Sequence, residues 1–283
     1  MSENIEIVKM SGDLVPFDVS KLTNSLKRTG ADDVILKQVI HDVEDILYEG
    51  ITTTEIYKKA FTLLRKSSRS NAARYKLKKA ILELGPTGYP FEKFVSEILS
   101  HLGYKVKVGS VVKGHCVDHE VDIEAEKDEH HFMIECKFHN DQKNHCNVKV
   151  PLYIQSRFKD VKRQWIKKKG HDQKFHQGWI YTNTRFTLDA SQFGNCVNLK
   201  LVGWSYPEKD NLRDQIITNN LYPITCLTTL TKREKQELLE KDIILCKHLL
   251  KNRKALDMIG IKKSKSKAIL EECKNLCYTH ITK

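Results

Sequence analysis

The chain has 283 residues, of which 40% are hydrophobic and 30% are charged, and its formal net charge is +12 at pH 7. This length allows two or three globular domains, and the absence of a long apolar run excludes transmembrane helices. The positive charge indicates a polyanionic partner, most commonly nucleic acid, although composition alone also allows an acidic membrane surface or a merely solvated exterior.

The amino terminus and the cysteines indicate a cytoplasmic protein. Residues 1–6 have neither the basic leader nor the apolar core of a secretion signal. The eight cysteines include no Cys-x-x-Cys pair, so we expect reduced, mostly buried thiols rather than a zinc site.

Residues 1–85 are expected to form one domain, a strand pair followed by helices. The strands are expected over 5–9 and 14–18, on either side of a turn at Gly12. Asp18 is a candidate N-cap for the first helix, and residues 52–54 supply threonines that can cap the third. The second and fourth helices are expected over 34–47 and 72–84.

This first region resembles the ATP-cone, a small regulatory domain that binds ATP or dATP. The matching segments are Val8-x-Lys-x-x-Gly12, Phe17-Asp18-x-x-Lys21-Leu22, Gly50-Ile51-x-Thr53-x-Glu55-Ile56 and Ala73-Arg74-Tyr75. The resemblance implies that Lys9 and Lys21 contact phosphates, with Asp18 and Thr53 nearby. Met10 replaces the arginine that is usual in the family, which removes a bidentate phosphate donor. A helical accessory domain with solvated lysines, or one that binds DNA or a partner, is the alternative.

A central domain is expected over 86–210, after a linker rich in glycine and proline. Its first helix, from Phe91 to Leu102, carries an apolar stripe and also Glu92. A strand follows over 104–112. Two further strands are expected over 121–125 and 131–138, joined by a turn at Asp128 and Glu129.

This hairpin is expected to carry a metal site. With the turn centred on residues 128 and 129, Asp122 lies opposite Glu135, and Lys137 lies on the same face of its strand as Glu135. Opposed carboxylates repel each other unless a cation lies between them, and such oxygen ligands suit Mg²⁺ or Mn²⁺. An exposed hairpin with charged residues on its wet face is the alternative.

Asp122 followed by Glu135-Cys136-Lys137 resembles the PD-(D/E)xK signature of restriction-endonuclease-like nucleases, particularly the Mrr-type branch and archaeal Holliday-junction resolvases. Val121 stands where the nominal signature has proline. The resemblance implies an α/β fold, a mixed sheet flanked by helices. It also implies that Asp122 and Glu135 bind the metal, that Lys137 is catalytic, and that Glu92 completes the metal sphere. Glu120 is a further candidate ligand.

Six histidines flank this site, but their spacing lacks the paired pattern of structural zinc. We therefore expect polar or DNA-contacting histidines. These residues are His115, His119, His130, His131, His139 and His145.

A helix over 148–166 is expected to face nucleic acid. Gln155 and Arg157 are candidates for contacting the scissile region, because relatives of such nucleases often carry a polar residue on this helix. Lys162, Arg163 and Lys167 belong to a basic run that is interleaved with aromatic residues and suits a phosphate backbone. A solvated, lysine-rich helix face is an equal alternative.

The remaining segments predict a mixed α/β sheet and a helical end. Strands are expected over 178–186 and 197–204 with a short helix between them, and residues 211–283 are expected to form a basic, helical third domain. Within it, residues 259–270 resemble half of a helix-hairpin-helix, and a generic helical domain is the alternative.

Taken together, the sequence predicts a Mg²⁺-dependent DNA endonuclease that is regulated by ATP or dATP. Its expected partners are DNA and nucleotide, not membrane, and a homodimer that cuts both strands is left open. The alternative is a non-catalytic, nucleotide-responsive DNA-binding protein that retains the nuclease fold.

Overall fold

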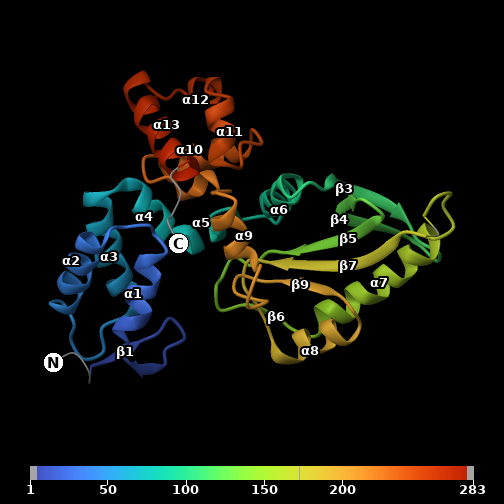
Figure 1. Ribbon diagram of the computed structural model, residues 1–283, viewed down its shortest axis with the longest axis horizontal. Coiled ribbons are helices and arrows are strands. Elements are labelled where there is room, and N and C mark those ends of the chain that lie inside the picture. Colours follow the sequence, from blue (N-terminus) through green and yellow to red (C-terminus); the bar gives the residue numbers. More distant parts are fainter. Residues whose placement is uncertain (1–4, 172, 279–283) are drawn as a thin grey trace. The chain divides into compact units, whose positions relative to one another are not determined.

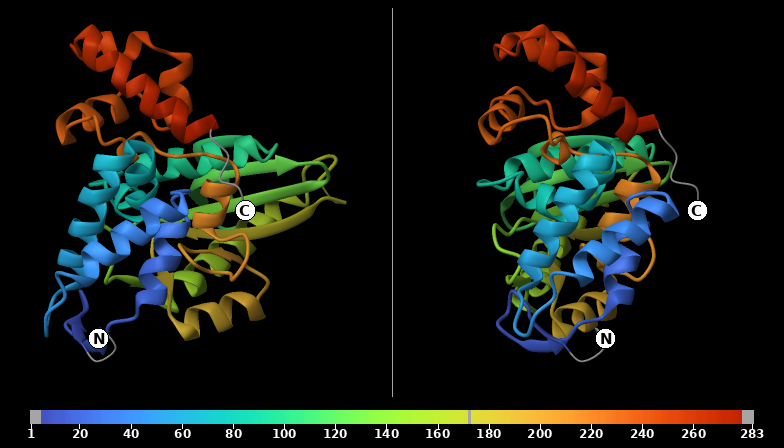
Figure 2. Two further views of the ribbon diagram at one scale, coloured as in Figure 1. Left: turned by 60° about the vertical axis from the view of Figure 1, so that its left-hand side comes forward. Right: turned by 90° about the vertical axis from the view of Figure 1, so that its left-hand side faces the viewer.

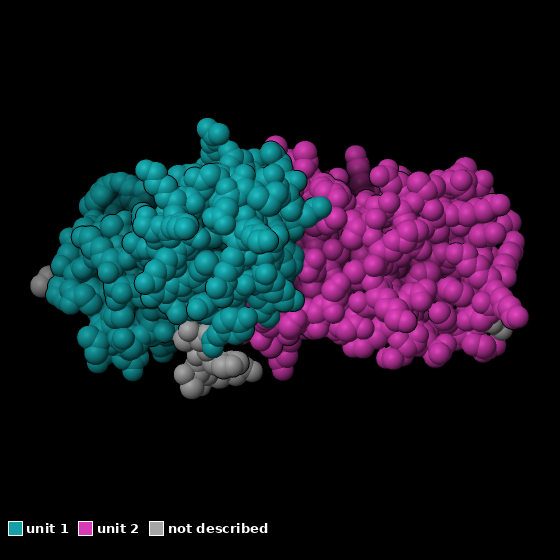
Figure 3. All heavy atoms as spheres, turned by 90° about the horizontal axis from the view of Figure 1, so that it is seen from above, with its two compact units in different colours: residues 1–80, 222–283 teal, residues 81–221 magenta. Residues whose placement is uncertain are grey.

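The computed structural model describes residues 5–171 and 173–278. The chain divides into two compact units, one made of residues 1–80 and 222–283 and the other of residues 81–221 (Figure 3). The predicted α/β fold is confirmed, with helices at the amino end, a central mixed sheet and a helical carboxyl-terminal region (Figure 1).

The first unit begins with a strand pair and three helices, as the sequence predicts. Strand β1 (Glu6–Val8) pairs antiparallel with β2 (Leu14–Pro16), and the helices are α1 (Val19–Lys27), α2 (Asp33–Glu44) and α3 (Thr53–Ser67). The Asp18 carboxylate accepts a hydrogen bond from the Ser20 backbone N–H at 2.9 Å, which confirms it as the cap of α1. Thr52 and Glu55 form a capping box at the start of α3.

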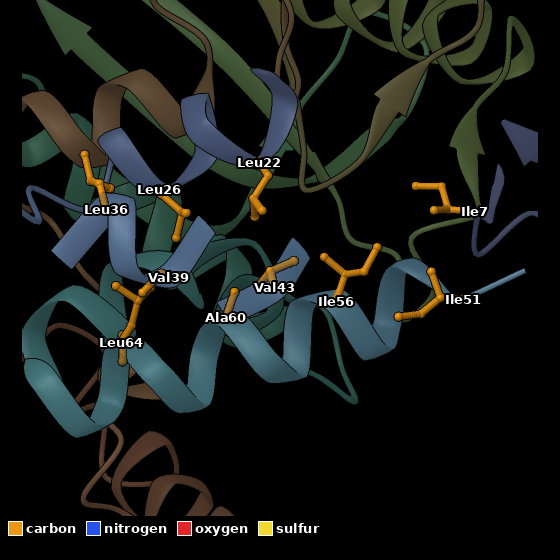
Figure 4. Packing of buried hydrophobic residues seen from close by; sticks show 11 residues of the cluster. Ile7, Leu22, Leu26, Leu36, Val39, Val43, Ile51, Ile56, Ala60 and Leu64 are labelled. Atoms are coloured by element: carbon orange, nitrogen blue, oxygen red, sulfur yellow. The ribbon is translucent and has the colours of Figure 1, made fainter. Parts of the chain in front are cut away.

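These helices pack on one another through apolar residues spaced four apart. Ile56, Ala60 and Leu64 form the buried stripe of α3, and Leu22 and Leu26 form that of α1 (Figure 4). The whole cluster consists of Ile7, Leu22, Leu26, Leu36, Val39, Val43, Ile51, Ile56, Ala60, Leu64 and Ala72.

The prediction of one continuous helix over 72–84 is wrong. The chain forms α4 (Arg69–Tyr75) and then α5 (Leu77–Leu82), with a break at Lys76. Helix α4 begins three residues earlier than predicted, because the Ser68 hydroxyl accepts from the Asn71 backbone N–H at 3.3 Å and caps it.

The carboxyl-terminal helices belong to the same unit as residues 1–80. They are α10 (Lys232–Leu239), α11 (Cys246–Lys251), α12 (Lys254–Met258) and α13 (Lys263–Tyr278), after a short 3₁₀ turn, η1 (Ile224–Cys226). Arg74 donates to the backbone carbonyl of Asn275 at 2.8 Å, and the Thr225 hydroxyl donates to that of Ala80 at 2.7 Å. Segments far apart in the sequence therefore share one folded unit.

The second unit is built on a five-stranded sheet in the order β3-β4-β5-β7-β9. The strands are β3 (Lys105–Lys113), β4 (Asp118–Lys127), β5 (His130–Lys137), β7 (Phe175–Thr182) and β9 (Lys200–Val202). The first three run antiparallel and the last three parallel, which makes the sheet mixed. The single strand that we expected over 178–186 is divided: β7 ends at Thr182, and β8 (Arg185–Phe186) pairs with β6 (His145–Cys146) in a separate two-stranded sheet that was not predicted.

Helices complete this unit: α6 (Tyr89–His101), α7 (Lys149–Trp165), α8 (Leu188–Cys196) and α9 (Leu212–Thr218) (Figure 2). Helix α7 packs on one face of the sheet, where Phe158 and Ile154 meet Met133 of β5 in a buried cluster. Because strand residues alternate in direction, Phe132 and Ile134 face the other way. Among the described residues, no helix is both long and apolar enough to cross a bilayer.

Candidate metal centre

The hairpin of β4 and β5 has the register that the sequence predicts. Five residue pairs run from Lys127 opposite His130 to Ile123 opposite Ile134. The turn contains Asp128 at φ +50°. The pairing therefore ends one residue before Asp122 and Glu135, which lie where the two strands part.

A side chain replaces the backbone ladder at this point. The Asp122 Oδ2 atom accepts a hydrogen bond from the Cys136 backbone N–H at 2.7 Å. Across the other edge of β4, the register places Gly109 opposite Asp122, although the two do not pair, and Gly109 has φ +61°. Glycine adopts this left-handed conformation without strain and adds no side chain beside the carboxylate.

Burial and mutual repulsion perturb the carboxyl groups here. The pKa of Glu135 is raised to about 7, chiefly by burial and then by the negative charge of Asp122. Burial also raises the pKa of Asp122, against the hydrogen bond from Cys136. On α6, burial followed by the charges of Asp122 and Glu135 raises the pKa of Glu92 to about 7. The site thus brings several carboxyl groups close together with too little positive charge to balance them.

Two basic side chains offset part of this charge. Arg157 of α7 donates to the Glu135 Oε2 atom at 2.7 Å and to the backbone carbonyl of Glu120. Lys137, at the exposed end of β5, lowers the pKa of both Asp122 and Glu135. The predicted group of Asp122, Glu135 and Lys137 therefore lies together, with Glu92 within electrostatic reach.

The residues present fit a hard divalent cation. Asp122 and Glu135 supply the two carboxylates that Mg²⁺ usually takes from a protein, since water and phosphate complete its sphere. Burial is the main cause of the raised pKa of both groups, and a cation bound between them would favour their ionised forms. In the part of the chain that the structure describes, no three histidine, cysteine or acidic side chains are grouped to hold an ion by themselves.

Comparison with known proteins bears on this site directly. A family model described as "Restriction endonuclease", of the Mrr type, matches residues 85–204, and one described as "AF1548-like, C-terminal" matches residues 222–277. An uncharacterized protein of Archaeoglobus fulgidus is 34% identical over 183 residues, which is 64% of this chain and 99% of the relative. The chain belongs to the AF1548-like family.

A solved structure supports the same conclusion. The crystal structure of AF1548, described as a protein of unknown function, is 33% identical to this chain, covers 68% of it and 98% of its own length, and has a TM-score of 0.55. The AF1548-like protein described here thus has an Mrr-type restriction endonuclease domain and an AF1548-like carboxyl-terminal region. Neither family match includes residues 1–84, so the resemblance to an ATP-cone stays a prediction.

Helix α7 of this AF1548-like protein separates the predicted basic run from its aromatic residues. Lys162, Arg163 and Lys167 are exposed, in or just beyond α7. Phe158 and Trp165 are buried in the core, so the expected interleaving of aromatic and basic residues on one surface is wrong. Phe158 and Trp165 pack between α7 and the sheet. Gln155 is partly buried, and its Oε1 atom has no hydrogen-bond partner among the described residues.

Two of the histidines around the site, His119 and His139, have side-chain partners within the protein. His119 contacts Asp160 of α7 at 2.9 Å, and Asp160 also accepts from the Cys116 backbone N–H at 2.9 Å. These bonds hold the loop before β4 onto α7 and lower the pKa of Asp160. The His139 ring lies 3.5 Å from the Cys146 sulfur.

The sequence did not reveal a second polar cluster, which joins His131 of β5 and His176 of β7 to His171 in the turn before β7. His131 stacks on Trp165 with ring centroids 3.7 Å apart. The ring centroids of His171 and His176 lie 5.3 and 5.6 Å from that of His131. Burial and neighbouring positive charges lower the pKa of His131 to about 3. In the sequence His131 is one of six histidines that flank the site, and nothing there marks His171 or His176, because the pairing of β5 with β7 is what brings them to His131.

The predicted nucleotide residues lie in two groups in the first unit. Val8 and Thr52 form a parallel β-bridge, and Lys9 and Thr53 are the next residues after them in the sequence. Lys9 and Thr53 therefore lie near each other. Lys21 and Asp18 form an exposed ion pair of 3.2 Å at the start of α1.

Proposed function

We propose that this protein is a metal-dependent DNA endonuclease that hydrolyses phosphodiester bonds. The observation that carries the proposal is the meeting of Asp122, Glu135 and Lys137 where β4 and β5 part, inside a restriction endonuclease domain. The partly buried carboxylates supply charge for a cation, and Lys137 is exposed at the end of its strand, where a substrate can reach it.

In the proposed mechanism Asp122 and Glu135 would hold Mg²⁺ or Mn²⁺, and Glu92 would assist them. The ion, when bound, would supply a lowered pKa for the attacking water and charge stabilisation for the oxygens of in-line displacement. The Asp122 carboxylate is oriented by the Cys136 N–H, and Glu135 by Arg157. The ammonium group of Lys137 donates a hydrogen bond to the attacking water or the scissile phosphate and offsets the phosphate charge.

Lys137→Gln is expected to reduce cleavage by about 10²–10³-fold, the usual effect of removing one such donor. Supercoiled plasmid nicking under single-turnover conditions measures the change. Lys113→Gln, which removes an exposed charge at the end of β3, should retain activity. Equal nicking by wild type and Lys137→Gln would contradict the assignment. DNA binding without cleavage, with any divalent metal, would instead favour a non-catalytic DNA-binding protein.

The DNA partner is proposed to contact α7 and the residues just beyond it. Lys162, Arg163 and Lys167 are exposed and positively charged there, and Gln155 and Arg157 lie nearer the carboxylates. A homodimer would let one assembly cut both strands. Eight free thiols support a reducing, cytoplasmic location.

Regulation by ATP or dATP is proposed from the first unit. Lys9, Lys21, Asp18 and Thr53 would contact the nucleotide, and the two exposed lysines would attract its phosphates. Lys21→Gln should therefore weaken ATP binding about tenfold, as measured by calorimetry. Lys27→Gln, a matched exposed change at the other end of α1, should not. Equal affinities in wild type and Lys21→Gln would refute this nucleotide site.

A further inference from the structure

Arg157 is the basic residue most closely engaged with the carboxylates. Its Nη1 atom lies 2.7 Å from Glu135 Oε2, and its Nη2 atom donates to the Glu120 carbonyl on the neighbouring strand. The ring of Tyr153, one turn earlier on α7, lies 5.3 Å from the guanidinium carbon. Only 11% of the Arg157 side chain is exposed. The guanidinium group is therefore held across the ends of β4 and β5, where these strands part.

In this position the positive charge of Arg157 acts on Glu135 as the charge of a bound metal ion would. The guanidinium neutralises one of the carboxylates that would bind a metal, in a setting where water screens charge weakly. A divalent ion bound to Glu135 would lie about 2.1 Å from a carboxylate oxygen. It would therefore also lie close to the fixed charge of Arg157, which would repel it. Arginine does not lose its proton to relieve this repulsion.

We propose that Arg157 is a positioning residue that competes with the metal ion for Glu135. It holds Glu135 in place before the ion binds, and its charge sets the metal concentration at which the centre fills. The inference rests on the proposed nuclease function, because it takes Asp122 and Glu135 as the metal ligands. A structural clamp alone would stabilise the strand ends without weakening metal binding.

Mn²⁺ binding to the full chain without DNA tests the proposal, with calorimetry as the readout. Removal of the charge in Arg157→Gln should lower the Kd for Mn²⁺ by about tenfold. Arg157→Lys keeps the charge and loses the fork that spans two strands, so its Kd should stay near that of wild type. Lys159→Gln removes an exposed charge from the same helix and should also leave the Kd unchanged. Glu135→Gln should abolish binding, which identifies the site.

Two results would overturn the proposal: an Arg157→Gln protein that binds Mn²⁺ no more tightly than wild type, or an Arg157→Lys protein that binds it as tightly as Arg157→Gln. If Arg157→Gln does not fold, the Arg157 side-chain N–H resonance of the wild type is followed as Mg²⁺ is added. It should shift in step with binding, and an unchanged resonance rejects the competition. Tighter Mn²⁺ binding by Arg157→Gln, together with no DNA cleavage by the wild type, would refute the nuclease function alone. Metal-dependent cleavage by the wild type, together with unchanged Mn²⁺ affinity in Arg157→Gln, would refute only the role of Arg157.

Discussion

Glu135→Gln is expected to lower the rate of DNA cleavage by about 10³-fold or more. The same substitution is expected to stabilise the unit of residues 81–221 above pH 7. The loss of activity follows because glutamine removes the negative charge of a proposed metal ligand. The gain in stability follows because a partly buried carboxylate next to Asp122 is costly to keep ionised.

The direction of the stability change follows from the pKa. Folding raises the pKa of Glu135 from its usual value of 4.5 to about 7, so the folded protein binds more protons than the unfolded one between these pH values. The free energy of unfolding therefore falls as pH rises through this window. Glutamine resembles the protonated acid, and the variant should be more stable than wild type by roughly 1–3 kcal/mol at pH 8.

Urea denaturation without metal measures this difference. Trp165, Trp179 and Trp204 are the three tryptophans of the chain, and all belong to the unit of residues 81–221, so their fluorescence reports on that unit. The stabilities of wild type and Glu135→Gln should converge near pH 4. A variant that is less stable than wild type at pH 8 would show that Glu135 contributes favourably as an ion.

His131 should make the same unit sensitive to acid. Its pKa is lowered from 6.5 to about 3, first by burial and then by nearby positive charges such as His176 and Lys174. The carboxylates of Glu124 and Glu126 lie 3.8 and 3.6 Å from its ring, too far for a hydrogen bond that would offset burial. As pH falls from 6.5 toward 3, the unfolded chain takes up a proton that the folded chain refuses, so stability is lost.

His131→Phe should remove this part of the pH dependence. The free energy of unfolding of wild type should fall relative to the variant by up to about 1.4 kcal/mol per pH unit below pH 6.5, and the two should respond alike above pH 7. His130→Gln changes the exposed neighbour and should keep the slope of wild type. Parallel curves for wild type and His131→Phe between pH 6 and 4 would contradict the assignment to His131.

The metal centre could be predicted because its pattern is local. Two strands joined by a short turn fix their own register, so the position of the turn at Asp128 was enough to bring Asp122 near Glu135. The signature spacing of Glu135 and Lys137 lies within one strand and depends on no distant segment. The caps of α1 and α3 were predictable for the same reason.

Contacts between distant segments escaped prediction. The cluster of His131, His171 and His176 depends on the parallel pairing of β5 with β7. These two strands are separated in the sequence by the whole of α7. Likewise, the bond from Arg74 to Asn275 joins residues 201 positions apart. The bond from Arg157 to Glu135 was missed because periodicity places a residue on a helix face but does not say what that face meets.

The central claim, that Asp122 and Glu135 form a metal centre for DNA hydrolysis, is tested most directly by restoring metal to metal-free protein. Protein treated with EDTA is mixed with supercoiled plasmid, and Mg²⁺ or Mn²⁺ is then added. We predict no nicking before addition, nicking by wild type after it, and none by Glu135→Gln at any metal concentration. Nicking that persists in EDTA, or that Glu135→Gln performs at the rate of wild type, would contradict the claim.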